Sequence, residues 1–395
     1  MGMRVGIFGG SFDPVHNEHI RLVQEAFKSL CLDELIIVPA GTPPHKRHKD
    51  RASAEHRLKL CTLAFSAMER VRVSDYEIKN GGMSYTYLTC RHFKQAYKDA
   101  ELFWLVGTDM LRDFPTWKNP TDILSNVTLA VCARDEKSDW LAQEQSAFFD
   151  KFGCHFAVVD YNGKPVSSTK IRVLAGAGME IPQVPKQVAD YIDKHKLYAI
   201  PNADKALSLL SAKRKEHSLR VAVISAERAN AIGVSERKAI TASLFHDCAK
   251  NVQLSSPLLQ EFTLRDEWGS VPEAVLHQFT GAYIAEQVFG VTDEEVLDAI
   301  RYHTSGKENM SELGKLIFLA DMIEEERKFD GVETLRKLFY KPSKSSEKGA
   351  GALDDFLREA LRQTIAFLEK KGADMYPLTL QAYEFYRRYN YGNDE

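Results

Sequence analysis

The pattern of apolar residues changes half-way along this chain, and that change constrains the fold more than any other feature. Up to about Tyr198, short apolar runs alternate with amphipathic segments of helical spacing. From Ala203 onward, every periodic segment has helical spacing. Alternation of strands and helices predicts a doubly wound parallel α/β sheet, whereas an unbroken series of helices predicts an all-α bundle. We therefore expect two domains, residues 1–200 and 201–395.

Apolar runs in the first half are the expected strands: 5–8, 35–38, 71–73, 102–106, 127–131 and 156–159. The expected helices of the second half are 203–231, 235–249, 257–261, 273–289, 293–303, 312–329, 351–371 and 379–389. A capping box formed by Thr292 and Glu295 is expected to begin the fifth of these helices. Ligands of doubly wound sheets bind outside the carboxyl ends of the strands. Polar motifs that directly follow a strand are therefore candidate binding residues.

Composition places few further limits on function. The 395 residues carry a net charge of −3, which gives no electrostatic reason to expect nucleic acid as a partner. The six cysteines form no CxxC pair, as is typical of reduced thiols in a cytosolic protein. No apolar run is long enough to span a bilayer. We expect a cytoplasmic protein with neither nucleic-acid nor membrane partners, and a homodimer is left open.

A glycine turn follows the first expected strand and leads into a helix. Gly9 and Gly10 allow the backbone to approach a phosphate closely, and the helix start offers N–H donors. His16 and His19 are three residues apart, so on a first helical turn they share one face. Two imidazoles beside a phosphate can donate hydrogen bonds to a phosphoryl transition state. The alternative is a plain turn with two surface histidines.

Three other segments of the first half have the composition of ligand-binding loops. A basic loop containing His45 and Lys46 follows the second strand, and its alternative is a solvated charged loop. Gly107 and Asp109 follow the fourth strand, where they can meet an adenosine. Trp117 offers a flat face to a pyridine ring, although a core position is its simpler explanation.

A further helix is expected to begin at residues 167–169, which are all Ser or Thr and suit helix capping. The functional alternative is that this helix start binds the phosphates of ATP, with Arg172 one turn later.

The second half contains six residues of the types that bind divalent metals. They are His217, His246, Asp247, His277, His303 and Asp321. Imidazole and carboxylate are the ligands of borderline divalent metals, and Asp247 can bridge two ions. The alternative is a set of unrelated surface and core residues.

The motifs of the first half resemble those of the nucleotidylyltransferase superfamily. Its HxGH signature is matched at residues 16–19, with Glu18 in place of the glycine, and its ISSTxIR signature is matched at 166–172 except at the first position. Thr86, Gly107, Asp109 and Trp117 together resemble the bacterial nicotinate-nucleotide adenylyltransferases. The resemblance implies a Rossmann-like sheet, ATP with Mg²⁺, and nicotinate mononucleotide as the second substrate.

The same resemblance implies roles for individual residues. The residues implied for ATP are Gly9, Gly10, Ser11, Phe12, His19, Gly107, Asp109, Ser168, Thr169 and Arg172. Those implied for nicotinate mononucleotide are His45, Lys46, Thr86, Trp117 and Arg134. Catalysis is assigned to His16, His19, Lys46 and Arg172. The amide nicotinamide mononucleotide remains an alternative substrate.

The second half resembles the HD phosphohydrolase superfamily, and within it the symmetrical diadenosine tetraphosphate hydrolases. The resemblance rests on the segments 245–250, 299–304 and 319–324. It implies an HD helical bundle with iron on the six ligands, and manganese and zinc are alternatives that the ligand set does not exclude. It makes Asp247 catalytic and assigns phosphate binding to Lys250, Arg301 and Thr304. Dinucleoside polyphosphates are the implied substrates; other nucleotides, or nucleotide sensing without turnover, remain alternatives.

Overall fold

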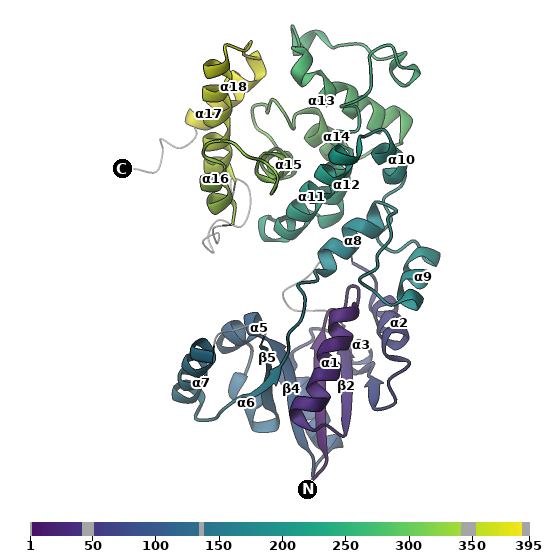
Figure 1. Ribbon diagram of the computed structural model, residues 1–395, viewed down its shortest axis with the longest axis vertical. Helices are drawn as coiled ribbons and strands as arrows, with labels where there is room; N and C mark the ends of the chain where they lie inside the picture. Colours follow the sequence, from purple (N-terminus) through teal and green to yellow (C-terminus); the bar gives the residue numbers. More distant parts are fainter. Residues whose placement is uncertain (1, 42–50, 134–137, 341–352, 389–395) are drawn as a thin grey trace. The chain divides into compact units, whose positions relative to one another are not determined.

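The structure, a computed structural model, describes residues 2–41, 51–133, 138–340 and 353–388. The chain divides into two compact units (Figure 1): Met1–Ile171 with Ile181–Leu197, and Arg172–Glu180 with Tyr198–Glu395. The chain therefore first passes from one unit to the other within a single helix, α8 (Ser168–Gly176). The domain boundary predicted at residue 200 stays a prediction.

The described residues of the first unit form a six-stranded parallel sheet. Its strands are β1 (Arg4–Gly10), β2 (Glu34–Pro39), β3 (Val71–Val73), β4 (Glu101–Gly107), β5 (Thr128–Ala133) and β6 (Ala157–Asp160). Their order is β3-β2-β1-β4-β5-β6, and every neighbouring pair is parallel. The doubly wound fold is confirmed, and each strand ends within two residues of its predicted limits.

Consecutive buried residues in the central strands explain why this sheet is parallel and covered on both faces. β1, β2 and β4 each contain at least four buried residues in a row. Successive side chains of a strand point to opposite faces, so both faces must be covered. The helices of this unit are α1 (Asn17–Leu30), α2 (Ala54–Phe65), α3 (Tyr76–Asn80), α4 (Thr86–Ala96), α5 (Thr108–Asp113), α6 (Pro120–Asn126), α7 (Ser138–Phe152) and α9 (Lys186–Lys194).

The strand order reverses between β1 and β4, which makes this position the binding crevice of the sheet. The chain leaves β1 toward β2 on one side and leaves β4 toward β5 on the other. Such reversal points open a crevice at the carboxyl ends of the two strands. Close contact of these strands requires glycine at position 9, because a Cβ there would lie 2.5 Å from Cζ2 of Trp104.

The described residues of the second unit contain helices and no strand, as predicted. The helices are α10 (Ala203–Ser208), α11 (Ala212–Ala229), α12 (Glu236–Phe245), α13 (Glu273–Tyr283), α14 (Glu294–Arg301), α15 (Glu312–Ile323), α16 (Val332–Phe339), α17 (Asp354–Lys371) and α18 (Pro377–Arg388). None of the helices in the described part of the chain is sufficiently long and apolar to cross a bilayer.

Four details of the predicted helices are wrong, one of which is that α15 ends at Ile323 rather than at residue 329. The helix predicted over 203–231 is interrupted before α11, which is capped by Ser211 through a hydrogen bond from the Arg214 N–H. α16 was not predicted. α14 is capped by Asp293 rather than by Thr292, because the Asp293 carboxylate accepts hydrogen bonds from two backbone N–H groups at the helix start.

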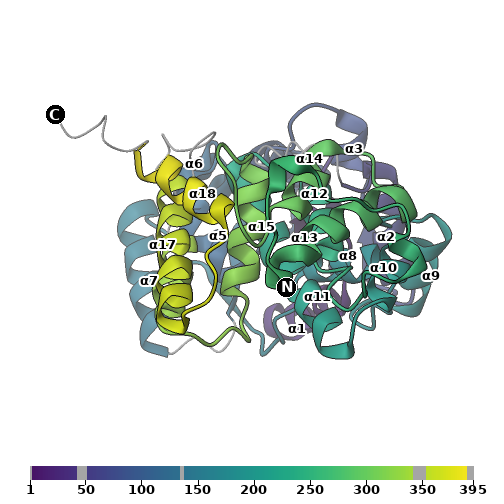
Figure 2. The ribbon, with the colours of Figure 1, turned by 90° about the horizontal axis from the view of Figure 1, so that it is seen from above.

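Helix α15 lies at the centre of the second unit. Figures 1 and 2 show α17 on one side of it and α11, α12 and α14 on the other. Nine of its twelve residues are buried, which is the pattern of a helix surrounded by others rather than one at the surface. Side chains of α15 can therefore contribute to a site enclosed by several helices.

Candidate active sites

The two histidines of the first motif lie side by side where α1 begins. His16 is the N-cap residue, and its backbone N–H donates a hydrogen bond to Nδ1 of His19 over 3.1 Å. The two rings stack with their centroids 3.6 Å apart. Because Nδ1 of His19 accepts this bond, the proton of the neutral ring is on Nε2. His19 can therefore donate a hydrogen bond from Nε2.

Buried Arg57 joins the turns that follow β1 and β2. Its guanidinium donates to the carbonyl oxygens of Ser11 and Gly41 over 2.8 and 3.0 Å. Phe12, in the same turn, has φ 48° and packs edge-on against His19 with ring centroids 5.1 Å apart. The turn predicted to meet ATP is thus held by the side chain of Arg57, which comes from α2.

Glu18 occupies the position at which the superfamily motif has glycine. Its side chain is buried, and Oε2 accepts hydrogen bonds from the Tyr161 hydroxyl over 2.6 Å and from the Lys164 backbone N–H over 3.0 Å. The carboxylate therefore connects α1 to the segment that follows β6.

The residues predicted beside the second substrate come from two adjoining segments. Thr86 begins α4, and Trp117 is half-buried against Phe114 with ring centroids 5.4 Å apart. Lys118 lies over the ring of Tyr85, its Nζ 4.2 Å from the centroid. The neighbours of Thr86 and Trp117 are thus in contact, which brings the two segments together.

The start of α8 lies beside the loop after β1. The Ser168 hydroxyl donates to the carbonyl oxygen of Pro14 over 3.1 Å, although 154 residues separate them. At the end of β4, a Cβ on Gly107 would lie 2.6 Å from Oδ1 of Asp109.

Arg172 has a different environment from the one predicted. Its Nε lies 2.6 Å from Oε1 of Glu236, and both side chains are buried within the second unit. The predicted contact of this guanidinium with ATP phosphates stays a prediction. The other predicted residues of this site, His45, Lys46 and Arg134, lie outside the described residues.

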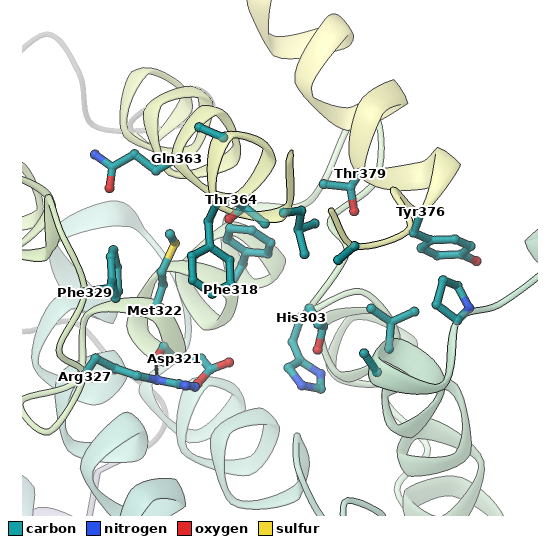
Figure 3. A pocket seen from close by; sticks show the side chains of 18 of the residues that line it. His303, Phe318, Asp321, Met322, Arg327, Phe329, Gln363, Thr364, Tyr376 and Thr379 are labelled. Atoms are coloured by element: carbon teal, nitrogen blue, oxygen red, sulfur yellow. Dashed lines mark hydrogen bonds and ion pairs between the residues drawn. The ribbon is translucent and has the colours of Figure 1, made fainter. Parts of the chain in front are cut away.

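In the second unit, the six predicted metal ligands come together from five helical segments. The structure groups them in three overlapping sets of possible ligands: His217, His246 and Asp247; His246, His303 and Asp321; Asp247, His277 and His303. In Figure 3, Asp321 and His303 point into the same space, and Asp321 is paired with Arg327.

Asp247 lies at the centre of this cluster and faces two groups of histidines. Oδ2 lies 3.6 Å from Nε2 of His246 and 4.0 Å from Nε2 of His217. Oδ1 lies 3.5 Å from Nε2 of His277 and 3.6 Å from Nε2 of His303. One carboxylate therefore presents one oxygen to each group, as a ligand that bridges two ions must.

Backbone carbonyls orient two of the histidines. Nδ1 of His246 lies 2.6 Å from the carbonyl oxygen of Ser243, and Nδ1 of His303 lies 2.7 Å from that of Ile300. Each Nδ1 thus carries the proton, and each Nε2 lone pair faces the cluster.

The protonation states also fit a cation. Burial lowers the pKa of His246 to about 4 and that of His277 to about 2, so both are neutral at pH 7. Burial alone would raise the pKa of Asp247, but the neighbouring histidines, His246 first, hold it well below its ordinary value. Nε2 of His246 is buried and has no hydrogen-bond partner. Neutral imidazoles, ionised carboxylates and an unpaired buried nitrogen are the features of a divalent-metal site.

A cavity of about 910 Å³ adjoins the cluster, and three of the cationic side chains that line it lie next to proposed metal ligands. Arg214 pairs with Oδ2 of Asp247 over 2.9 Å, and Lys250 lies 3.1 Å from Nε2 of His277. Arg327 pairs with Asp321. Three cations on the side of the cavity next to the cluster suit a substrate with several phosphates.

Two of the three residues predicted to bind phosphate line this cavity. They are Lys250 and Thr304. Arg301 is not among the lining residues, and its guanidinium instead pairs with Glu294 over 2.9 Å.

Comparison with known proteins identifies both halves. The Cytidylyltransferase-like family model matches residues 7–174, and the HD domain model matches residues 214–326. Over 194 residues, the chain is 38% identical to a Clostridium acetobutylicum protein named "Probable nicotinate-nucleotide adenylyltransferase", and the match covers 49% of this chain and 97% of that protein. The chain belongs to the nicotinate-nucleotide adenylyltransferase family.

Some relatives combine both halves. A Mycoplasma genitalium protein named "Probable nicotinate-nucleotide adenylyltransferase/Ap4A hydrolase" is 29% identical over 329 residues, which cover 83% of this chain and 89% of that protein. A Clostridium acetobutylicum crystal structure described as a predicted HD superfamily hydrolase involved in NAD metabolism is 31% identical, with 47% of this chain and 96% of that one covered and a TM-score of 0.39. The match of the HD domain model to residues 214–326 shows that this member of the adenylyltransferase family also carries an HD domain, as the sequence motifs predicted.

Sequence motifs of the nicotinate-nucleotide adenylyltransferase and HD families did not single out every side chain near the cluster. Arg214 lies three residues before His217 on α11, hence on the same helical face, and that spacing was the available signal. Glu324, which contacts His217, ends the segment 319–324 on which the HD resemblance rests, but no role was assigned to it, because its contact depends on where α15 ends.

Proposed function

We propose that the first unit transfers the adenylyl group of ATP to nicotinate mononucleotide and releases pyrophosphate. Family membership supports this proposal, as does the stacked pair His16 and His19 at the carboxyl end of β1, next to the reversal of strand order. Mg²⁺ would arrive bound to ATP.

The proposed reaction needs positioning and charge compensation rather than a base. A phosphate oxygen of the mononucleotide attacks the α-phosphorus of ATP, and the bond from that phosphorus to the β-phosphate oxygen breaks. The attacking phosphate is already anionic, so no proton must be removed. His19 donates a hydrogen bond from Nε2 to the transferring group. The start of α8, with Ser168 and Thr169, offers N–H groups to the ATP phosphates.

Roles for His45, Lys46, Arg134 and Arg172 stay predictions from the family resemblance. The roles of Thr86 and Trp117 at the pyridine ring have the same basis.

Competing substrates test the specificity of the first unit. We expect a higher kcat/KM for nicotinate mononucleotide than for the amide, because N–H donors near a helix start favour a carboxylate. Both constants should be measured on the full chain with ATP and Mg²⁺. Equal constants, or a preference for the amide, would reject the proposal.

For the second unit, we infer hydrolysis of a symmetrical dinucleoside tetraphosphate to two nucleoside diphosphates. The observation that carries this inference is Asp247 between two groups of histidines, beside a cavity on which Arg214, Lys250 and Arg327 lie next to the cluster. The double name of the Mycoplasma genitalium relative agrees with it.

Different residues would bind the metal ions and the phosphates in this hydrolysis. His217, His246, Asp247 and Asp321 would hold one ion, and His277 and His303 would complete a second site with Asp247. A bound divalent metal supplies an activated water at neutral pH. Arg214, Lys250 and Arg327 would orient the phosphates, and Thr304 lies beside them on the cavity wall. Iron is the proposed metal, and manganese and zinc suit the same donors.

Metal analysis combined with a nucleotide panel tests the second activity. We expect transition metal in the full chain after anaerobic purification, and turnover of diadenosine tetraphosphate ahead of ATP and of a guanosine alarmone. Preferred turnover of ATP or the alarmone would replace the proposed substrate. Nucleotide binding without any turnover would make this unit a sensing module instead.

The remaining proposals concern the whole chain. We propose one activity for each predicted domain, 1–200 and 201–395, and a cytoplasmic location, with nucleotides rather than nucleic acid as partners. None of the six cysteines, which all lie among the described residues, takes part in a disulfide, which agrees with a reducing compartment.

A further inference from the structure

Glu324 follows the last residue of α15 and is buried beside the metal cluster. Only 3% of its surface is exposed. Oε1 lies 3.3 Å from Nδ1 of His217, and Oε2 lies 2.7 Å from Nε of Arg220. Oε2 also accepts a hydrogen bond from the Glu326 backbone N–H over 3.0 Å. The carboxylate is thus fixed by an arginine and a backbone group, and its other oxygen faces a proposed ligand.

The other nitrogen of His217 is the one that faces the cluster. Nε2 lies 2.9 Å from Oδ1 of Asp321 and 4.0 Å from Oδ2 of Asp247. The ring therefore has one nitrogen directed to the metal position and the other directed to Glu324. His246 and His303 have the same arrangement, except that their Nδ1 atoms meet backbone carbonyls.

A carboxylate in this position has a different effect from a carbonyl. Both accept the Nδ1 proton and so fix which nitrogen is free to bind metal. The anionic carboxylate also increases electron density on the ring and strengthens Nε2 as a ligand. Among the three oriented histidines of the described cluster, only His217 has this anionic partner.

We propose that Glu324 is a positioning residue of the HD metal centre. It holds His217 with Nε2 toward the ion and strengthens that nitrogen as a donor, and Arg220 holds Glu324 in place. Arg214, His217 and Arg220 lie at spacings of three on α11, so one face of that helix supplies a cavity cation, a ligand and the anchor of its partner. The inference rests on the proposed function, because it requires that the cluster binds metal.

Metal affinity, measured on the full chain, tests this role directly. Mn²⁺ binding to metal-depleted protein can be followed by electron paramagnetic resonance, which reports the free ion. We expect Glu324→Gln to weaken binding about 10- to 100-fold, as is typical when such a partner of a ligand is lost. The matched control is Glu325→Gln, since Glu325 is exposed and lies 4.0 Å from Nε of Arg220. We expect the control to bind as the unchanged protein does.

A purely structural role would have a different signature. If Glu324 served only to neutralise Arg220, Glu324→Gln would lower the melting temperature of the metal-free protein and leave Mn²⁺ affinity unchanged, which would overturn the proposal. Absence of Mn²⁺ binding by the unchanged protein would overturn the proposed function as well. If Glu324→Gln did not fold, Arg220→Gln would replace it. Loss of this anchor should also weaken Mn²⁺ binding, and unchanged affinity there would overturn the role.

Discussion

Glu18 shows how a single residue can depart from a family motif and keep the local structure. Glycine at this place would leave the Tyr161 hydroxyl and the Lys164 N–H without the carboxylate that they now contact. Because both contacts join α1 to residues near the end of β6, Glu18 stabilises the packing on which the position of His19 depends.

We expect Glu18→Ala to destabilise the first unit by about 1–3 kcal/mol, because buried hydrogen-bonding groups lose their partner. The measurement is the midpoint of thermal unfolding. The control is Gln24→Ala on the exposed face of α1, for which we expect little change. Equal midpoints for the two variants would show that the Glu18 contacts contribute nothing to stability.

Residue types and the resemblance to HD phosphohydrolases were sufficient to predict which six side chains come together, but not what surrounds them. The signal was the adjacent pair His246 and Asp247 together with four further residues of metal-binding type. The role of Glu324 could not be predicted, since it depends on the packing of the end of α15 against α11. The pairing of Arg172 with Glu236 could not be predicted either, because it depends on tertiary packing between residues that are 64 positions apart.

At the scale of elements, the predictions from the sequence differ from the structure mainly in where helices begin and end. We expect Asp293→Ala to destabilise the protein by about 1 kcal/mol, since its carboxylate accepts the N–H groups of Glu295 and Val296 at the start of α14. Thr292→Ala is the matched control, because Thr292 is exposed and its change should remain within about 0.5 kcal/mol. Chemical denaturation of both variants is the measurement. A larger effect at Thr292 would restore the capping box.

The strands were predictable because parallel strands buried on both faces are nearly continuous apolar runs. Helix interruptions were less predictable. Ser211 is the N-cap of α11. The apolar residues on both sides of it keep the spacing of one helix, so the periodicity predicted a single helix in place of α10 and α11. The end of α15 at Ile323 was also missed, since polar residues beyond it do not exclude a helix.

At the scale of the whole molecule, the two proposed activities should separate by mutation. His19→Ala removes a donor to the transferring phosphoryl group and should lower kcat of adenylyl transfer about a hundredfold or more. Hydrolysis should persist in this variant, because every proposed metal ligand lies in the second unit. Asp247→Ala should abolish hydrolysis and leave transfer intact. Both rates should be measured in both variants, with circular dichroism to verify folding; loss of both rates in one folded variant would contradict independent sites.

Acid should destabilise the metal-free protein in two stages. Burial lowers the pKa of His246 to about 4 and of His277 to about 2, against about 6.5 in an unfolded chain. The unfolded state therefore binds more protons below about pH 6.5, and stability falls as the pH decreases from there toward 4. Asp247 and Asp321 have folded pKa values below their ordinary ones, so the stabilisation they provide is lost only at still lower pH.

Thermal unfolding of chelator-treated protein between about pH 7 and pH 5 measures the first stage. We expect the midpoint to fall over this range, and to fall less in His277→Gln, which lacks one buried imidazole. A midpoint that did not change with pH in the unchanged protein would contradict the neutral state of these histidines.

The path of α8 has a consequence for anyone who divides this gene. Val173 and Ala177 belong to the same buried apolar cluster as Ala206 and Ile240, and Arg172 neutralises buried Glu236. A coding sequence that begins at residue 200 would give an HD domain that lacks Arg172, Val173 and Ala177. Its product would expose part of a hydrophobic core and would leave the buried carboxylate of Glu236 without its cation. We expect both defects to make the protein insoluble. Expression of the HD domain alone should therefore start ahead of residue 168.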